Sequence, residues 1–485
     1  MSLAHRRNVL FILSDEHNRD VLGCYGDPIV QTPNLDALAR RGVRFDNAYC
    51  ASPICVPSRA SLAVGRPVHL TRCWDNAFPY HGQHTSWHHV LRRQGYRVAS
   101  IGKLHFRSSA DDNGFSEEIL PLHVRNGIGD IRGLLRTQLP PKARPGELAE
   151  MAGPGLSSYA QYDQRIADAA CRWLQQAASE PKGQPWALFV SLVLPHFPLI
   201  APKRYFDLYS GEEIYARRAR KRFLPLGHPV LDRMRRFLCY DEYFTHEMRC
   251  TAMQAYYGMV TCLDARIGAV LEALRGADRN RDALVIYASD HGDNLGARGL
   301  WGKSVMYEDA AAIPLLMAGA GLPAGLANPT PVTLMDIFPT LLDATELDEP
   351  AVRTQLCGTC LTDLVSKPNP ERAILSQYHA TGSVTGQFML RKGDWKFVHY
   401  EGYRPQLFNL KNDPDESRDL GENPEYAGQR GLMDTELRRL VDPTTANTRA
   451  LADQAQRVRE LGGVDAVLSA SQVSFTPAPG DNEPN

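Results

Sequence analysis

Cys55 begins a short segment whose residue types could perform nucleophilic chemistry. Pro57 follows two positions later, Arg59 ends the segment, and the residues from Ala60 to Gly65 are compatible with a helix. Proline is common at the start of a helix, and the N-terminus of a helix attracts anions and favours a thiolate. An activated thiol is therefore one interpretation. A single cysteine near a helix start is more often inert, so these residues alone leave both interpretations open.

Acidic residues follow two continuous apolar segments. Such segments are typical of strands covered on both faces, and ligands of open α/β sheets bind beyond the carboxyl ends of the strands. If the two strands are neighbours, three carboxylates and an imidazole converge, and the hard oxygen ligands favour Ca²⁺, Mg²⁺ or Mn²⁺. The alternative is that each acidic pair is a solvated strand end or a helix cap. The residues are Asp15 and Glu16 after residues 9–13, and Asp290 and His291 after residues 283–288.

A third apolar segment and two helical patterns complete the expected core. Residues 186–193 form the apolar segment, residues 34–41 follow a helix-start signal, and residues 252–274 repeat apolar residues at helical spacing. Strands that alternate with helices predict an α/β fold with a large, mostly parallel sheet sandwiched by helices. Residues 111–158 are rich in Gly and Pro, and we expect them to loop over the surface and to cover a substrate.

The chain of 485 residues is too long for one simple core, since single cores stop growing near ~250–300 residues. A segment containing two prolines, residues 366–370, predicts the boundary between two domains. We expect a catalytic α/β domain, residues 1–366, and a smaller C-terminal α+β domain with an antiparallel sheet, residues 367–485. In the second domain, the patterns predict strands at residues 387–391 and 395–400, a helix at 426–440, and a mobile or partner-bound tail from Phe475 onward.

The overall composition narrows the expected partners. A net charge of −1 gives no reason to expect nucleic acid or an anionic membrane, and the basic residues 217–222 are expected on a solvated surface. No segment approaches the ~20 apolar residues that span a bilayer, and the apolar run near the start is shorter than a signal-peptide core of ~7–15 residues, so we expect a cytoplasmic protein. Cys357 and Cys360 have the spacing of a redox or metal-binding pair, but without a second pair nearby we interpret them as loop cysteines.

Several motifs, taken in their order along the chain, resemble those of the type I sulfatases, a family within the alkaline phosphatase superfamily. Cys55–Arg59 followed by Gly65-Arg66 resembles the signature in which the cysteine is oxidised to formylglycine. The resemblance spans most of the chain. Two segments, Trp74–Asn76 and Phe197–Tyr209, are most similar to the bacterial branch that includes choline sulfatases and phosphonate monoester hydrolases. The further matching segments are Thr32–Asp36, Gly42–Phe45, Gly102–His105, Pro195–Pro198, Ser289–Gly292, Gly302-Lys303, Tyr307-Glu308, Leu407–Leu410 and Asp413–Glu416.

The resemblance implies a sulfatase that hydrolyses small-molecule sulfate monoesters with a formylglycine (3-oxoalanine) made from Cys55. A formylglycine-generating enzyme or an anaerobic sulfatase-maturating enzyme would make it. One hydroxyl of the aldehyde hydrate attacks sulfur, with Asp290 as proton acceptor, and the second loses its proton to His105 and expels sulfate. The implied metal is Ca²⁺, with Mg²⁺ or Mn²⁺ as alternatives, held by Asp15, Glu16, Cys55, Asp290 and His291. The implied catalytic residues are Cys55, Arg59, Lys103, His105, His196 and Lys303, and the implied substrate-binding residues are Asn76, His196 and Lys303.

Two positions depart from the family pattern, and two other functions stay open. Glu16 stands where many sulfatases have Asp, and His291 stands where many have Asn, which leaves the exact metal open. A phosphonate monoester or phosphodiester hydrolase with the same nucleophile is the first alternative, although Lys103 and His105 favour a sulfatase. A non-catalytic anion-binding relative is the second. Residues 376–386 contain no acid for a trimethylammonium group, so choline sulfate is not the favoured substrate. The alcohol half of the substrate and the oligomeric state, including a homo-oligomer, are left undetermined.

Overall fold

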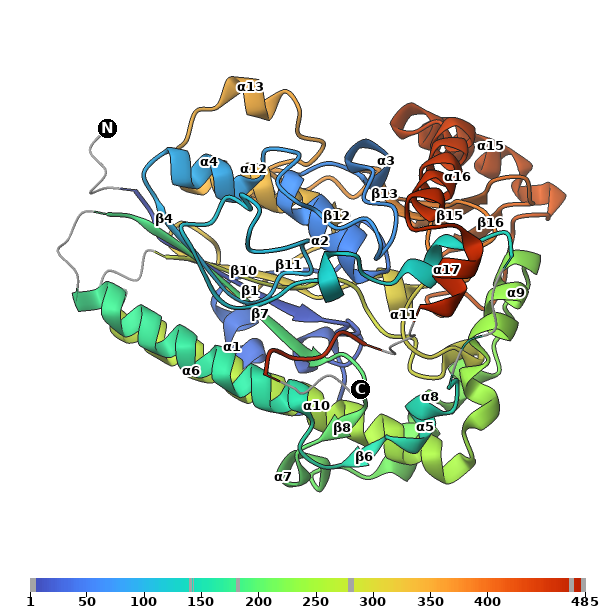
Figure 1. Ribbon diagram of the computed structural model, residues 1–485, viewed down its shortest axis with the longest axis horizontal. Coiled ribbons are helices and arrows are strands. Elements are labelled where there is room, and N and C mark those ends of the chain that lie inside the picture. The colour runs from blue at the N-terminus through green and yellow to red at the C-terminus, as the bar shows by residue number, and fades with distance from the viewer. Residues whose placement is uncertain are drawn as a thin grey trace.

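A computed structural model describes residues 6–138, 142, 144–179, 184–277, 283–470 and 475–480 (Figure 1). In these residues the centre of the fold is an eight-stranded sheet with the strand order β11-β2-β10-β9-β1-β7-β4-β5. β1 lies between β7 and β9 and is parallel to both, whereas β10 is antiparallel to its two neighbours. The strands are β1 Val9–Asp15, β2 Val43–Phe45, β4 Arg97–Lys103, β5 Glu117–Leu122, β7 Trp186–Pro195, β9 Leu284–Ser289, β10 Leu315–Ala318 and β11 Leu326–Asn328.

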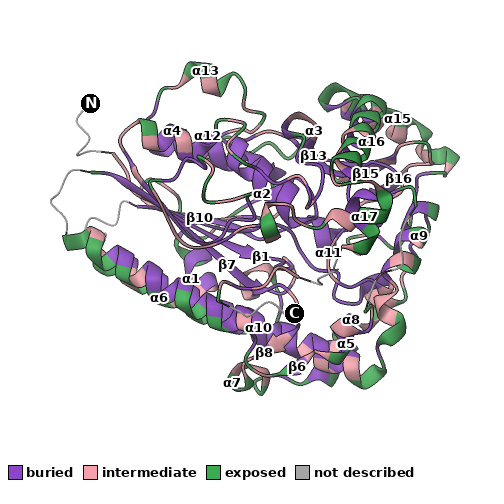
Figure 2. Cartoon of the chain, in the orientation of Figure 1, coloured by how far each residue is buried: buried purple, intermediate pink, exposed green. Residues whose placement is uncertain are grey.

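Helices cover both faces of this sheet, because the central strands are apolar on both sides. Leu10 and Ile12 of β1 pack against one group of helices, whereas Val9, Phe11 and Leu13 pack against the other. Figure 2 shows the buried sheet between helices whose outer faces are exposed. The predicted α/β fold with a large, mostly parallel sheet sandwiched by helices is therefore confirmed. The first group contains α1 Pro33–Arg41, α6 Ser158–Ser179 and α10 His246–Ala277, and the second contains α2 Cys55–Val64, α4 Trp87–Arg93 and α12 Ile337–Ala344.

A second, antiparallel sheet of four strands lies beside the large one, as predicted. Alternating apolar residues of its strands pack on α15, while the other face packs on residues that precede this sheet in the chain. We propose residue 366 as the boundary between the two domains, because this sheet begins shortly after it. The elements are β13 Ile374–Tyr378, β14 Gln387–Lys392, β15 Trp395–Tyr400, β16 Gln406–Asn409 and α15 Ala427–Leu440, followed by α16 Pro443–Glu460 and α17 Val464–Ser469.

Two expectations from the sequence need correction. Residues 111–158 are not a loop throughout, because they contribute β5 to the edge of the large sheet. The basic residues 217–222 lie on α8, Gly211–Arg222, and the expectation of a solvated surface is wrong for two of them. Arg218 is buried, and both Arg218 and Lys221 form ion pairs with the buried Asp309, at 3.0 and 3.1 Å. Buried charges that pair in this way belong to the core and not to a solvated face.

None of the helices in the described part of the chain combines the length and the apolar character that a bilayer crossing requires.

All 10 cysteines lie in described residues and are free, including Cys357 and Cys360. Both lie outside helices and strands, which agrees with their interpretation as loop cysteines.

A buried lysine of the second sheet pairs with two buried carboxylates and yields a prediction about stability. Lys396 of β15 is fully buried, and its Nζ lies 2.9 Å from Glu308 Oε1 and 2.7 Å from Glu416 Oε1. Lys396→Met keeps the volume but removes the cation that lies between the two buried carboxylates, of which Glu308 keeps Arg19, at 3.2 Å, as a partner. We expect the free energy of unfolding to fall by about 3–5 kcal/mol, the cost of breaking a buried ion pair. Urea denaturation measures the change. Lys411→Met, at an exposed lysine, is the control and should change it by less than about 0.5 kcal/mol. Equal stability of both variants would contradict the prediction.

Candidate active site

Cys55 is the first residue of α2, and the local sequence explains the start and the end of this helix. Ile54, just before the helix, is extended, and Gly65 ends the helix in the left-handed region, with φ of 68°. The side-chain oxygen of Asn76 accepts a hydrogen bond from Val56 N at 3.2 Å, which satisfies one of the free amide groups of the first turn. The Cys55 side chain is buried. Cys55 therefore lies at the positive end of a helix dipole, as the sequence predicted.

The carboxyl ends of β1 and β9 lie next to each other and close to Cys55. Ser14 is in register with Ser289 across the two parallel strands, so Asp15 and Asp290 leave the sheet side by side. His291 Nε2 lies 3.1 Å from Cys55 Sγ, 3.8 Å from Asp15 Oδ1 and 3.6 Å from Asp290 Oδ1. These four ligand atoms lie within 4.8 Å of one another. The structure thus brings together four of the five residues that the sequence assigned to a metal.

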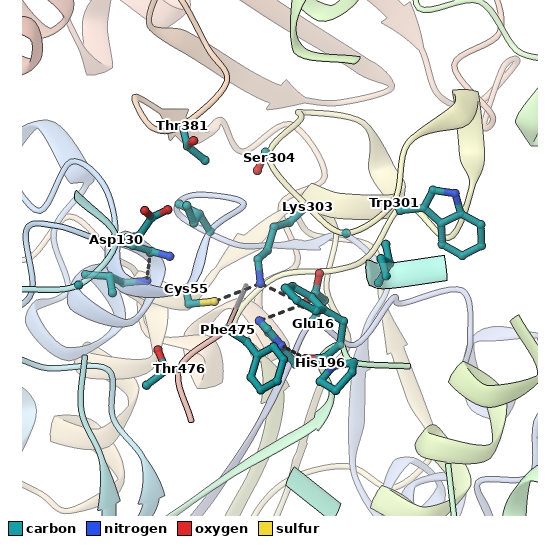
Figure 3. Close-up of a pocket in the computed structure, with 18 of the residues that line it drawn as sticks. Glu16, Cys55, Asp130, His196, Trp301, Lys303, Ser304, Thr381, Phe475 and Thr476 are labelled. Atoms are coloured by element: carbon teal, nitrogen blue, oxygen red, sulfur yellow. Dashed lines mark hydrogen bonds and ion pairs between the residues drawn. The ribbon is translucent and has the colours of Figure 1, made fainter. Parts of the chain in front are cut away.

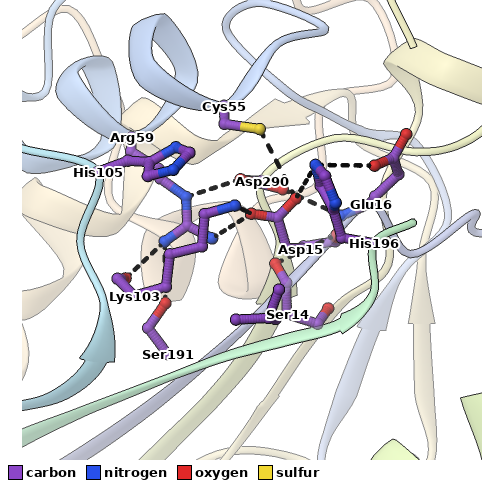
Figure 4. Close-up of polar contacts among 12 residues, drawn as sticks. Ser14, Asp15, Glu16, Cys55, Arg59, Lys103, His105, Ser191, His196 and Asp290 are labelled. Carbon is purple, nitrogen blue, oxygen red and sulfur yellow. Dashed lines mark hydrogen bonds and ion pairs between the residues drawn. The ribbon is translucent and has the colours of Figure 1, made fainter. Parts of the chain in front are cut away.

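Two cations hold the outer oxygens of these carboxylates (Figure 4). Arg59 donates from Nε to Asp290 Oδ2 at 2.7 Å and from a terminal nitrogen to Asp15 Oδ2 at 2.9 Å. Lys103 Nζ lies 2.6 Å from the same Asp15 Oδ2. Burial opposes ionisation of Asp15, but the charges of Lys103, Arg59 and Lys303 outweigh it and hold its pKa well below the usual range. The inner Oδ1 atoms of both aspartates are left facing Cys55 and His291.

Glu16, the fifth predicted ligand, belongs to a second group of possible ligand atoms, which it forms with Asp15 and His196 and whose members also lie within 4.8 Å of one another. Its Oε2 is 3.0 Å from Lys303 Nζ and 3.4 Å from His196 Nε2, whereas its Oε1 is buried and has no hydrogen-bond partner among the described residues. Burial is the main cause that raises the pKa of Glu16 to about 7. Lys303 Nζ also donates to Cys55 Sγ at 3.3 Å. Lys303 therefore connects Glu16 with the nucleophile position.

Both predicted histidines lie in the site and are neutral. The Nδ1–H of His196 donates to the backbone oxygen of Phe197 at 2.7 Å, which turns Nε2 toward Glu16. His105 Nε2 lies 3.2 Å from Thr476 Oγ1. Burial lowers the pKa of both imidazoles well below the usual value, and the nearby Lys103 lowers it further. A neutral imidazole can accept a proton, which is the property that the role assigned to His105 needs.

A single cavity contains the nucleophile position and most of the predicted site (Figure 3). Cys55, Asn76 and Glu16 line it, together with residues of the segment 111–158 that the sequence expected to cover a substrate. The empty space in the cavity and its open mouth, part of which is open solvent, amounts to roughly 1650 Å³. The other predicted residues that line it are Lys103, His105, His196 and Lys303.

Sequence reasoning missed several residues of this cavity. Phe475 and Thr476 of the tail line it, and so do Tyr159 and Phe197. The expectation of a mobile or partner-bound tail is wrong for residues 475–480, which pack on their own chain, while residues 481–485 lie outside the described residues. One signal could have found this contact, because Phe475 is a large aromatic residue that opens an otherwise polar, proline-rich tail.

Comparisons with known proteins agree with this geometry. Residues 7–347 match the sulfatase family, and residues 296–442 match the family described as N-sulphoglucosamine sulphohydrolase, C-terminal. A choline-sulfatase of Rhizobium meliloti is 32% identical over 96% of this chain and 89% of its own length, and an arylsulfatase K of Danio rerio is 30% identical over 90% of this chain and 84% of its own.

A solved structure extends the similarity to the bacterial branch. The phosphonate monoester hydrolase of Agrobacterium radiobacter superposes with a TM-score of 0.69 at 25% identity, over 90% of this chain and 95% of its own. The predicted branch, with choline sulfatases and phosphonate monoester hydrolases, is therefore confirmed. The chain belongs to the sulfatase family of sulfuric ester hydrolases.

Proposed function

We propose that this protein hydrolyses sulfate monoesters with a formylglycine made from Cys55 and a divalent metal ion beside it. One observation carries the proposal: Cys55 lies at the N-terminus of α2, with its Sγ 3.1 Å from His291 Nε2 and 3.7 Å from Asp15 Oδ1. A nucleophile, metal ligands and the positive end of a helix thus meet at one point, where a tetrahedral anion such as sulfate would be bound.

The donor atoms fit a metal ion. Separations of 3.1 to 3.8 Å among Sγ, the imidazole nitrogen and the aspartate Oδ1 atoms are those expected of ligands around one ion. The buried Oε1 of Glu16, without a hydrogen-bond partner among the described residues, is a further oxygen that a cation would satisfy. We propose Ca²⁺ because carboxylate oxygens dominate the set, with Mg²⁺ or Mn²⁺ as alternatives. When bound, the ion would neutralise negative charge on the sulfuryl group and help to ionise the nucleophile.

The side chain at position 55 explains why oxidation is needed. Formylglycine supplies a hydrate with two hydroxyls, of which one attacks sulfur and the other releases sulfate. Burial and the charge of Asp15 together raise the pKa of the unmodified Cys55 thiol to about 12, so the thiol itself is a poor nucleophile at neutral pH. We propose that a formylglycine-generating enzyme or an anaerobic sulfatase-maturating enzyme performs the oxidation.

Residues on three sides of Cys55 then have separate roles. Arg59 and Lys103 hold the carboxylates of Asp15 and Asp290 in place. Asp290 would accept the proton of the attacking hydroxyl, and His105 would accept the proton of the second. Lys303, with its Nζ 3.3 Å from Sγ, would stabilise the negative charge of the transferring sulfuryl group, and Asn76 could donate from its amide nitrogen to a sulfate oxygen.

The reaction specificity is tested by comparing two substrates. Similarity to a phosphonate monoester hydrolase keeps that activity as the alternative. Lys103 and His105 favour sulfate esters, because the resemblance places uncharged hydroxyl residues at these positions in the phosphonate enzymes. We expect a higher kcat/KM on 4-nitrophenyl sulfate than on an aryl phosphonate monoester. The opposite order would assign the alternative function, and no turnover of either by formylglycine-bearing, metal-loaded protein would assign an anion-binding protein.

His196 gives a prediction about the leaving group. Its Nε2 points toward Glu16 at the carboxyl edge of the sheet, where an alcohol oxygen would depart. Since the imidazole is neutral, His196 would pass to this oxygen the proton that Glu16, with its pKa of about 7, can hold. A nitrophenolate leaves without help, whereas an alkyl alkoxide needs a proton, and general acid assistance contributes ~10²–10⁴-fold. His196→Ala should therefore reduce the rate on alkyl sulfates by about 10²-fold or more, and the rate on activated aryl sulfates much less.

The test measures rates across sulfate esters of graded leaving-group pKa. If the rate of His196→Ala falls more steeply with rising leaving-group pKa than the rate of the wild type, His196 assists departure of the alcohol. Equal losses on good and poor leaving groups would show that His196 binds the substrate without assisting departure. His246→Ala is a matched control, because His246 is an exposed histidine outside the cavity.

A further inference from the structure

Residues 475–480 of the tail return to the active site after α17. Two prolines stiffen this short segment, and two hydrogen bonds fix it to α6: Tyr159 donates to the backbone oxygen of Thr476 at 2.5 Å, and Arg165 donates to that of Pro479 at 2.5 Å. Ala478 is buried in the main core. The segment is therefore anchored on the chain at several points.

The first residue of this segment completes an aromatic wall beside the leaving-group histidine (Figure 3). The ring of Phe475 meets the ring of Tyr159 edge to face at 5.4 Å and the ring of Phe197 at 6.1 Å. Phe197 in turn stacks on His196 at 4.6 Å. Phe475 and Phe197 are both partly exposed and both line the cavity, so their rings present apolar surface where the alcohol half of a substrate would lie.

The second residue contacts the proposed base directly. Thr476 Oγ1 lies 3.2 Å from His105 Nε2, while His105 Nδ1 is buried without a hydrogen-bond partner among the described residues. His105 has a backbone φ of 54°, so its position is unusual and needs support from its surroundings. The hydroxyl of Thr476 therefore fixes the orientation of the imidazole.

We propose that Phe475 and Thr476 are parts of the active site: Phe475 forms, with Phe197 and Tyr159, a subsite for the alcohol half, and Thr476 is a positioning residue for His105. The inference rests on the proposed function of the same cavity. The subsite fits an alcohol with a flat apolar face, that is, an aryl group. Quaternary ammonium groups also bind aromatic rings, but six cationic and four anionic side chains line this cavity, and this excess of positive charge opposes a cationic alcohol.

Binding to a protein that cannot turn over tests the subsite independently of catalysis. In a Cys55→Ala background, calorimetry measures the Kd of 4-nitrophenyl sulfate, hexyl sulfate and choline sulfate. Phe475→Ala should weaken the aryl ester about tenfold, which is about 1.4 kcal/mol and within the range of an aromatic pair, and hexyl sulfate by less than about twofold. Phe223→Ala, at an exposed phenylalanine outside the cavity, is the control and should change neither.

Unchanged affinity for the aryl ester, or equal losses for the aryl and alkyl esters, would overturn the aryl subsite. If Phe475→Ala weakens the binding of choline sulfate more than that of the other two esters, the aryl subsite is overturned in favour of an ammonium site. Wild-type protein that hydrolyses no sulfate ester would reject the proposed function, while the binding comparison would still decide the subsite.

Steady-state kinetics test the second residue in otherwise wild-type protein. Thr476→Val removes the hydroxyl but keeps the shape, and should lower kcat about tenfold with little change in KM, because a misplaced base slows the chemical step. It should also shift the pH profile of kcat, and Thr476→Ser should restore both. The positioning role would be overturned if Thr476→Val left kcat unchanged, or if Thr476→Ser failed to restore kcat and its pH profile. Melting temperatures of all variants show whether the fold is preserved.

Discussion

Replacement of Cys55 by serine is expected to abolish multiple turnover of sulfate esters while leaving the fold intact. A serine hydroxyl could attack sulfur once, but it has no second hydroxyl with which to expel sulfate, so the enzyme would stop as a sulfated ester. Removal of the nucleophile of a hydrolase costs on the order of 10⁶-fold in kcat, and we expect a loss of that order. Release of 4-nitrophenolate, measured as a burst and as a steady rate, checks the result.

A second cysteine provides the matched control. Cys50 is also buried, lies five positions earlier, and has no assigned role in the chemistry. Cys50→Ser should keep the steady rate within about one order of magnitude, since substitutions away from the chemistry act through stability alone. Multiple turnover by Cys55→Ser near the wild-type rate would contradict the two-hydroxyl mechanism. Loss of turnover in both variants, with lowered melting temperatures, would indicate a packing effect.

Substitution of Asp290 by asparagine is expected to remove the bound metal and the activity together. The two side chains have nearly the same shape, so the variant removes one negative charge that faces His291 and Cys55 and one partner of Arg59. Each preorganised electrostatic contact in an active site contributes on the order of 10²–10³-fold, and a metal ligand should contribute at least that much. Asp15→Asn should behave in the same way, because Asp15 Oδ1 faces the same point.

Elemental analysis of the purified variants measures the metal content and identifies the ion in the wild type. Asp46→Asn is the control, since Asp46 forms a partly exposed ion pair with Arg44 at 2.8 Å. Full metal occupancy in Asp290→Asn and Asp15→Asn would rule out the proposed site. A fall in activity with unchanged metal content would leave Asp290 as a proton acceptor that does not bind the ion.

Much of the sheet could be predicted from the sequence, because its central strands are continuously apolar. Residues 9–13 and 186–193 are buried on both faces. Their apolar residues are therefore continuous along the chain and can be recognised without knowing which strands lie beside them. The carboxyl ends of such strands bear the functional residues, and the structure indeed places Asp15 and Asp290 next to each other. The family resemblance added the identity of Cys55 as a nucleophile, which its position at a helix start alone did not decide.

Other parts of the molecule depend on contacts that no local pattern records. The inward direction of Arg218 and Lys221 follows from Asp309, about ninety residues later in the chain. The place of Glu16 between Lys303 and His196 could not be derived from its neighbour Asp15, because the backbone turns sharply there, with a φ of 67° at Glu16. The tail was interpreted from its polar composition, whereas its position is determined by Tyr159 and Arg165 on α6.

The most direct test of the account is the chemical state of Cys55. Trypsin releases the peptide from residue 45 to Arg59, which contains both Cys50 and Cys55. For protein made in a host with a maturating enzyme, we predict that denaturation and alkylation add one group to this peptide, at Cys50, and that an aldehyde-specific hydrazide adds one group at position 55. Two alkylated cysteines and no hydrazide product, in protein that nevertheless hydrolyses sulfate esters, would contradict the formylglycine mechanism.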